Sequence, residues 1–441
     1  NPEERIANGD DVLFIIFLAI FLRFNDLSYM EFKKDEAVNC SLATDFVSKG
    51  IFPLVGDEAS IGSYNAPAFI YLLSVPFLFS RDPLFAAGYI ALLNILAIYL
   101  CFLFCKDFFN KRVALVAMAL FAINPWVIFY SRKLWSSNAL PLFILAFFYS
   151  LYKVILKREH KYILLCFASL AICTQLQPIS VSCAVILFLA LMFFRPQVKP
   201  LYYLIGSSIF LLLYIPYILY DIKNNFYNLS VYLKLSGLPF KLEPSAFVIP
   251  FKLATTSEFI KLLNWPTLDV FQFLLLFCSI VYLAYNFKER RYCILLLWFF
   301  VPVLFLLIDK VSLPRHYFIS LYPAQFILIA ILIDALIKKW GKRYRLDLLL
   351  PTLVSLIMCY NFISFFNFNS YIKSGRDLYW LGYGPPFKHR VEEIKSLVDK
   401  GEVDLESIHN AVSRDSKRFK CDFMATKYIV ENLDYISYEK D

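Results

Sequence analysis

Apolar residues dominate this chain in runs that recur along its length and are separated by short polar stretches. Most runs are long enough to cross the ~30 Å hydrocarbon core of a bilayer as a helix. A backbone in lipid must satisfy its own hydrogen bonds, which a helix does. The pattern therefore predicts about eleven transmembrane helices, over residues 11–25, 84–105, 113–130, 137–152, 162–175, 179–194, 200–219, 267–287, 293–308, 316–337 and 347–366.

Basic residues gather in alternate connections between these runs. Short loops rich in Lys and Arg stay in the cytoplasm. With eleven spans, all five basic loops fall on one side, which predicts a cytoplasmic N-terminus and an external C-terminus. The loops are those of Lys106 to Arg112, Lys153 to Lys161, Arg195 to Lys199, Lys288 to Arg291 and Lys338 to Arg345.

A shorter apolar run over residues 66–80 breaks this alternation, because counting it as a span would move Lys106 and Arg112 outside. We expect it to be a re-entrant or interfacial helix on the outer face. A polar stretch precedes it, in which apolar residues recur at helical spacing until Gly50, with Pro53 following as helix stops do. Residues 26–80 are therefore predicted to form a first outer loop with juxtamembrane helices.

Two further polar regions face outward in this topology. Residues 220–266 form a second large outer loop, which is aromatic and rich in proline. Residues 367–441 form a C-terminal extracytoplasmic segment, in which VEEIKSLVDK predicts an amphipathic helix. The predicted fold class is thus an all-α polytopic membrane protein, with a transmembrane domain over residues 1–366 and a small external cap.

Composition agrees with a membrane protein, since 59% of residues are hydrophobic and the mean hydropathy is +0.59. That excludes an ordinary soluble globular protein. The net charge of +9 comes mostly from the basic loops and suits anionic lipid, so we expect no nucleic-acid partner. The ten cysteines show no metal-type spacing, and we expect neither a metal site nor a cofactor. Pairing between Cys40 and Cys421, both outside the spans, is left open.

Asp35 and Glu36 form an acidic pair just after the first apolar run, at the outer edge of the membrane. A carboxylate there can take a proton from an attacking hydroxyl or amine. The alternative is a solvated helix start that favours acids through the helix dipole. Outward basic residues are the exception in such loops, and these suggest a phosphate held at the interface or, alternatively, side chains reaching lipid headgroups. The basic candidates are Arg132, Lys133, Lys310, Arg315 and the adjacent His316.

Other polar and aromatic residues are weaker candidates. Gln175 and Gln177 are polar at membrane depth, where they either bind sugar hydroxyls or pair helices. Tyr64, Trp135 and Trp265 could stack on a sugar ring, but the pattern favours anchoring in the aromatic belt at the outer membrane interface. The second acidic pair, Asp57 and Glu58, is interpreted as solvated.

The order of these features resembles the C-type glycosyltransferase superfamily, in its branch of protein O-mannosyltransferases and lipid A aminoarabinose transferases. An Asp-Glu pair follows the first span, as in KKDEAVN, and a proline-led aromatic stretch, NAPAFIYLL, comes next. FYSRKLW, TQLQPIS, PRHYFISLYP and a Tyr383-Gly384 pair then follow in the family's order. His316 departs from the Tyr that usually follows the Arg, and Gln177 stands where His is frequent.

The resemblance implies a membrane enzyme that moves a sugar from a polyprenyl-phosphate donor to a lipid, glycan or protein acceptor by an inverting displacement. It implies that Asp35 is the base, Glu36 its neighbour, and Arg132 and Arg315 phosphate ligands. The residues themselves add Lys133, His316, Gln177 and Tyr64 as candidate substrate or phosphate contacts. We expect a bacterial inner or plasma membrane location with an extracytoplasmic active site. The alternatives are a polytopic transporter, a glycan ligase that uses a lipid pyrophosphate, and a structural membrane protein.

Overall fold

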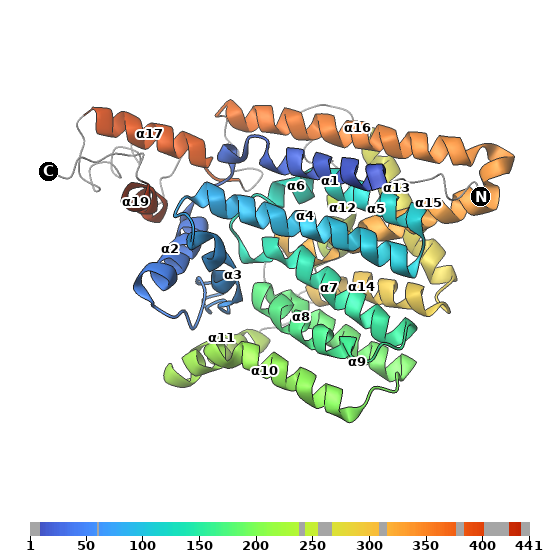
Figure 1. Cartoon of the computed structure of the whole chain (residues 1–441), viewed down its shortest axis with the longest axis horizontal. Coiled ribbons are helices and arrows are strands. Elements are labelled where there is room, and N and C mark those ends of the chain that lie inside the picture. Colours follow the sequence, from blue (N-terminus) through green and yellow to red (C-terminus); the bar gives the residue numbers. More distant parts are fainter. Residues whose placement is uncertain are drawn as a thin grey trace.

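A computed structural model describes residues 9–59, 61–237, 243–254, 267–307, 315–375, 383–400 and 423–433. Within these ranges the chain is built from helices, and the only β-type pairings are two isolated bridges, Glu31 with Pro386 and Glu58 with Tyr64. The long helices run side by side as one bundle (Figure 1). The predicted all-α polytopic fold class is confirmed.

Every predicted apolar run is helical in the structure. Six helices in the described residues are long and apolar enough to cross a membrane, and several apolar helices are shorter. The number of crossings, eleven, therefore stays a prediction. The helices that match the runs are α1 (Gly9–Phe24), α4 (Pro83–Phe108), α5 (Lys111–Ile123) with α6 (Pro125–Tyr130), α7 (Leu140–Leu156), α8 (Tyr162–Leu176), α9 (Val181–Phe194), α10 (Pro200–Lys223), α13 (Thr267–Tyr285), α14 (Arg290–Leu307), α15 (Tyr322–Tyr344) and α16 (Leu346–Lys373).

The connections α4–α5, α7–α8, α9–α10, α13–α14 and α15–α16, which carry the basic residues, all lie at one end of the bundle, at the right of Figure 1. Side-chain contacts join neighbouring helices at this end. Arg112 forms an ion pair with Asp334 at 3.2 Å, and the Tyr152 hydroxyl donates to the Arg291 carbonyl. This shared end agrees with the alternation that the sequence predicts.

The opposite end carries the expected surface helices α2 (Lys34–Lys49) and α3 (Ala68–Phe77), together with α17 (Phe387–Asp399) and α19 (Phe423–Asn432) (Figure 1). Helix α2 ends where Gly50 adopts a left-handed conformation with φ 68°. Glycine adopts such a φ without a steric penalty. The amphipathic helix after the acidic pair and the short helix within residues 66–80 are therefore both present.

A break between α5 and α6 directs the chain toward the candidate site. Pro125 cannot donate a backbone hydrogen bond, and the Asn124 side chain caps the new helix through the Val127 amide at 3.2 Å. Fully buried Arg23 of α1 donates to the Ala122 carbonyl at 2.9 Å, where α5 ends. The short helix α6 then leads directly into Arg132 and Lys133.

The second outer region holds more structure than a loop. It contains α11 (Tyr227–Ser236) and an apolar helix, α12 (Ser245–Ala254). Gln325 of α15 donates to the Pro250 carbonyl at 2.9 Å, so α12 packs against the bundle. Prolines recur in this region, and one of them, Pro250, lies inside α12. Because proline usually interrupts a helix, the sequence alone indicates a loop there.

Candidate active site

Asp35 and Glu36 lie in the first turn of α2 but in different environments. Asp35 is exposed, whereas Glu36 is fully buried. Glu36 Oε2 accepts a hydrogen bond from the Lys33 backbone amide at 3.1 Å, which caps the start of the helix. Of the two acids, therefore, Asp35 faces solvent and Glu36 supports the helix start.

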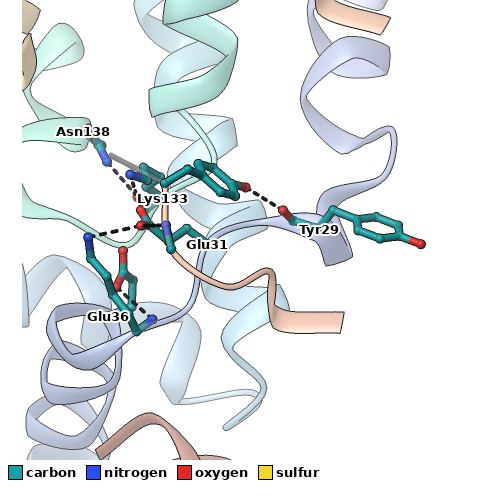
Figure 2. A network of polar contacts seen from close by, with 8 residues as sticks. Tyr29, Glu31, Glu36, Lys133 and Asn138 are labelled. Carbon is teal, nitrogen blue, oxygen red and sulfur yellow. Dashed lines mark hydrogen bonds and ion pairs between the residues drawn. The ribbon is translucent and has the colours of Figure 1, made fainter. Parts of the chain in front are cut away.

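The sequence reasoning missed Glu31, which is also fully buried. Its carboxylate forms ion pairs with Lys133 and with Lys33, the latter at 3.1 Å, and it accepts from the Gly384 amide (Figure 2). A carboxylate in the apolar interior needs such partners to remain ionised. The acid that precedes KKDE is a local signal, but two of its partners, Lys133 and Gly384, are far away in sequence.

The two buried acids titrate in opposite directions. Burial alone would raise the pKa of Glu31, but Lys133 and Lys33 outweigh it and hold that pKa below its ordinary value. Burial, reinforced by the charge of Glu31, raises the pKa of Glu36 to about 8. At neutral pH Glu31 is therefore an anion, whereas Glu36 mostly keeps its proton.

Aromatic rings surround Lys133, which is only 2% exposed. Its ammonium lies 4.2 Å from the ring centre of Trp135 and 5.4 Å from that of Tyr383. Lys33 lies 4.8 Å from the same Trp135 ring. Asn138 fixes the loop by donating to the Lys133 carbonyl at 3.2 Å (Figure 2). The structure makes Lys133 a partner of Glu31, and its direct contact with a phosphate stays a prediction.

Two other predicted residues, Gln177 and His316, come together beside Trp135. Gln177 Nε2 donates to the His316 carbonyl at 2.9 Å, and the His316 ring lies 5.1 Å from the Trp135 ring. The Gln177 side chain is buried, and its Oε1 has no hydrogen-bond partner within the described ranges. Gln175 instead donates to the Leu213 carbonyl at 3.0 Å, which joins α8 to α10.

The two predicted phosphate ligands have different described neighbours. Arg132 is buried and donates to the Asp26 carbonyl, and burial lowers its pKa. Arg315 is half-buried, with its guanidinium carbon 5.2 Å from the Trp126 ring centre. That both contact one phosphate stays a prediction.

Tyr64 lies on the side of α10 and α11. Its backbone amide donates to Asn228 Oδ1 at 2.7 Å, and its carbonyl accepts from the Tyr217 hydroxyl at 3.1 Å. Its ring is 5.5 Å from that of Tyr220. These contacts anchor the first outer loop, and contact of Tyr64 with substrate stays a prediction.

Asp57, expected to be solvated, is only partly exposed and accepts from Asn65 at 3.0 Å. Cys40 is buried in α2, whereas Cys421, Trp265 and Lys310 lie outside the described residues. In the part of the chain that the structure describes, no three His, Cys, Asp or Glu side chains cluster as metal ligands.

Comparison with known proteins gives a family match and a shared fold. Residues 65–220 match the family described as dolichyl-phosphate-mannose-protein mannosyltransferase. The matched stretch includes Arg132, Lys133 and Gln177 but neither the acidic pair nor Arg315. No curated protein sequence matches the chain.

Among solved structures, ArnT from Cupriavidus metallidurans bound to undecaprenyl phosphate aligns with 98% of this chain and 78% of its own, at 14% identity and a TM-score of 0.54. The same protein in the apo state aligns with 75% of this chain and 61% of its own, at 15% identity and a TM-score of 0.54. The archaeal oligosaccharyltransferase AglB from Archaeoglobus fulgidus, in complex with an inhibitory peptide and a dolichol-phosphate, aligns with 90% of this chain, at 14% identity and a TM-score of 0.50.

This chain spans 59% of the AglB chain and 61% of the apo ArnT chain. At these identities the likeness shows a common fold. Together with the family match, it confirms the resemblance to C-type glycosyltransferases that the sequence motifs indicate.

Proposed function

We propose that this chain, which shares its fold with C-type glycosyltransferases, transfers a sugar from a polyprenyl-phosphate donor to a lipid, glycan or protein acceptor. Two of the solved structures with a similar fold are bound to undecaprenyl phosphate and to a dolichol-phosphate. A carrier of this class would keep its tail in the bilayer and its phosphate at the depth of the helix ends. We place the reaction at the end of the bundle that carries α2, on the outer face of the membrane.

The observation that carries the proposal is the contrast between the neighbouring acids Asp35 and Glu36. Glu36 is buried, and its pKa of about 8 keeps it mostly protonated at neutral pH, so it is a poor proton acceptor. Asp35 is exposed at a helix N-terminus, where the helix dipole favours the carboxylate. Asp35 is therefore the general base of the proposed reaction.

The reaction is a single displacement. A hydroxyl or amine of the acceptor attacks the anomeric carbon from the face opposite the phosphate, and Asp35 takes its proton. The bond between the anomeric carbon and the phosphate oxygen breaks, and its electron pair leaves with the polyprenyl phosphate. One step inverts the anomeric centre without a sugar bound to the protein.

The leaving phosphate needs positive charge as it departs. Arg315 is the first candidate, because it is half-buried at the start of an apolar span and guanidinium pairs well with phosphate oxygens. Arg132 is the second candidate, and it would act from a more buried position. Gln177 would accept a hydrogen bond from a sugar hydroxyl through Oε1, and the His316 and Trp135 rings would flank the sugar.

The test is transfer by the purified protein in liposomes. Radiolabelled sugars are supplied on a short polyprenyl monophosphate and, in parallel, on the matching pyrophosphate. We expect label to move to an acceptor and polyprenyl monophosphate to be released from the first donor only. Use of the pyrophosphate donor would favour a glycan ligase, and passage of intact donor across the bilayer would favour a transporter. Either result would contradict the proposal.

A further inference from the structure

A segment near the C-terminus, residues 383–387, lies against the residues that lead into the acidic pair. The Phe32 amide donates to the Pro385 carbonyl at 3.0 Å, and the Phe387 amide donates to the Met30 carbonyl at 2.8 Å. Glu31 and Pro386 form an antiparallel bridge between these hydrogen bonds. The two segments are thus paired like a very short sheet, although more than three hundred residues separate them.

Further contacts extend this pairing on both sides. The Tyr383 hydroxyl donates to the Tyr29 carbonyl at 2.5 Å (Figure 2). The Phe387 ring packs edge-on against Phe32, with ring centres 5.4 Å apart. Segment 383–387 therefore holds the approach to α2 through both backbone and side-chain contacts.

Gly384 stands at the closest approach. Its amide donates to the Glu31 carboxylate. A Cβ at this position would lie 2.9 Å from Glu31 Oε1 and 3.2 Å from Lys33 Cδ. A Cβ at this position must therefore displace the Glu31 carboxylate, and Lys33 must also give way slightly.

Two contacts then connect Gly384 to the first turn of α2. Glu31 pairs with Lys33 at 3.1 Å, and the Lys33 amide caps the helix through Glu36. Asp35 lies between the two capping residues in sequence. A shift of Glu31 would therefore move the turn that carries Asp35.

We infer that residues 383–387 are a positioning element of the active site, which holds the first turn of α2 and so places Asp35 against the reacting sugar. The inference rests on the proposed function for the role of Asp35. The element acts through Glu31 and does not touch the substrate. Because misplacing a reacting group by about 1 Å can reduce turnover by roughly 10²-fold, a modest displacement should be measurable.

The test compares Gly384→Ala with a matched control, Gly237→Ala, whose added Cβ would make only an ordinary contact at 3.5 Å. We expect Gly384→Ala to lower kcat roughly 10- to 100-fold while the KM for the donor changes little. Adding Glu31→Asp withdraws the carboxylate from the new methyl group, so the double variant should recover part of the lost kcat. A purely global defect would not be rescued by shortening Glu31.

Amide hydrogen exchange gives a second readout that does not require activity. Peptides that cover residues 30–37 should exchange roughly tenfold faster in Gly384→Ala than in Gly237→Ala, because local opening becomes easier. Unchanged kcat and unchanged exchange in Gly384→Ala would overturn the inference. Lack of sugar transfer by the wild type would instead contradict the proposed function, and the exchange experiment would still decide whether segment 383–387 holds α2.

Discussion

The carboxylate of Glu31 and the ammonium of Lys133 form an ion pair that is almost completely removed from solvent, with side-chain exposures of 0% and 2%. Lys133 lies in a short connection where, by the predicted topology, basic residues are unusual. The pair explains why a lysine is found there. It also connects the loop after α6 to the residues that start α2, so two parts of the candidate site are held together by one contact.

The first prediction concerns this pair. Glu31→Gln leaves the Lys133 charge buried without its partner and should lower the free energy of unfolding by about 3–5 kcal/mol. Replacing both residues, with Lys133→Met added, should cost less than the sum of the two single changes. Thermal unfolding in detergent measures this. Single variants as stable as the wild type would show that the pair contributes nothing.

The direction in which the pKa of Glu31 is shifted determines how this ion pair changes stability with pH. The pKa of Glu31 is held below its ordinary value of 4.5, so its contribution is present above that pH and is lost as the pH falls through the native pKa. We expect the wild type to lose stability in acid more steeply than Glu31→Gln does. If the free energies of unfolding of the two proteins fall equally steeply in acid, the lowered pKa of Glu31 is wrong.

The second prediction concerns Glu36, whose pKa is raised from 4.5 to about 8. The folded state then binds more protons than the unfolded state between these values, so stability should fall as the pH rises from about 4.5 to 8. Glu36→Gln cannot ionise and should remove this slope while keeping most of the transfer activity. Unfolding measured at several pH values tests the slope, and an unchanged slope in Glu36→Gln would refute the raised pKa.

Much of the scaffold could be predicted from hydrophobic pattern alone, because each helix that meets lipid must be apolar along its length. The helix after the acidic pair was predictable too, since Gly50 and Pro53 are local stop signals. Helix α12 could not be predicted, because its apolar residues lie among prolines, and such a pattern is typical of a loop.

Only part of the polar network around Glu31 could be predicted. The local sequence indicates Asp35, Glu36 and the outward basic residues as candidates. Glu31, in contrast, contacts Lys133 and Gly384, which only the tertiary fold brings close to it. No local pattern records such pairings. Similarly, the sequence predicts that Arg132 and Arg315 both bind phosphate, whereas their described neighbours, Asp26 and Trp126, differ.

The third prediction concerns donor binding. Arg315→Ala should weaken binding of a polyprenyl-phosphate sugar by about 1.5–3 kcal/mol, or roughly 10- to 150-fold, because a charge-assisted phosphate contact is lost. Arg132→Ala should act in the same direction. Arg81→Ala removes an exposed outer arginine that contacts Ser48 and serves as the control. Wild-type affinity in both Arg315→Ala and Arg132→Ala would disprove the phosphate assignment.

The fourth prediction concerns topology. In a background without the exposed Cys278 and Cys359 and without Cys421 of the predicted external segment, a cysteine at Phe109 should be protected from an impermeant reagent added outside. Ser48→Cys in α2, at the other end of the bundle, should react. Labelling measured before and after membrane permeabilisation distinguishes the two faces. External reaction of the cysteine at position 109 would invert the proposed orientation and place Asp35 in the cytoplasm.

The most direct measurement of the central claim is single-turnover sugar transfer by Asp35→Asn under conditions in which the wild type is saturated with donor. Asparagine keeps the shape of the side chain but cannot accept the proton. We predict a rate roughly 10²–10⁴-fold below that of the wild type, with donor affinity unchanged. Transfer by Asp35→Asn at the wild-type rate would show that this carboxylate only starts a helix, and would contradict the account.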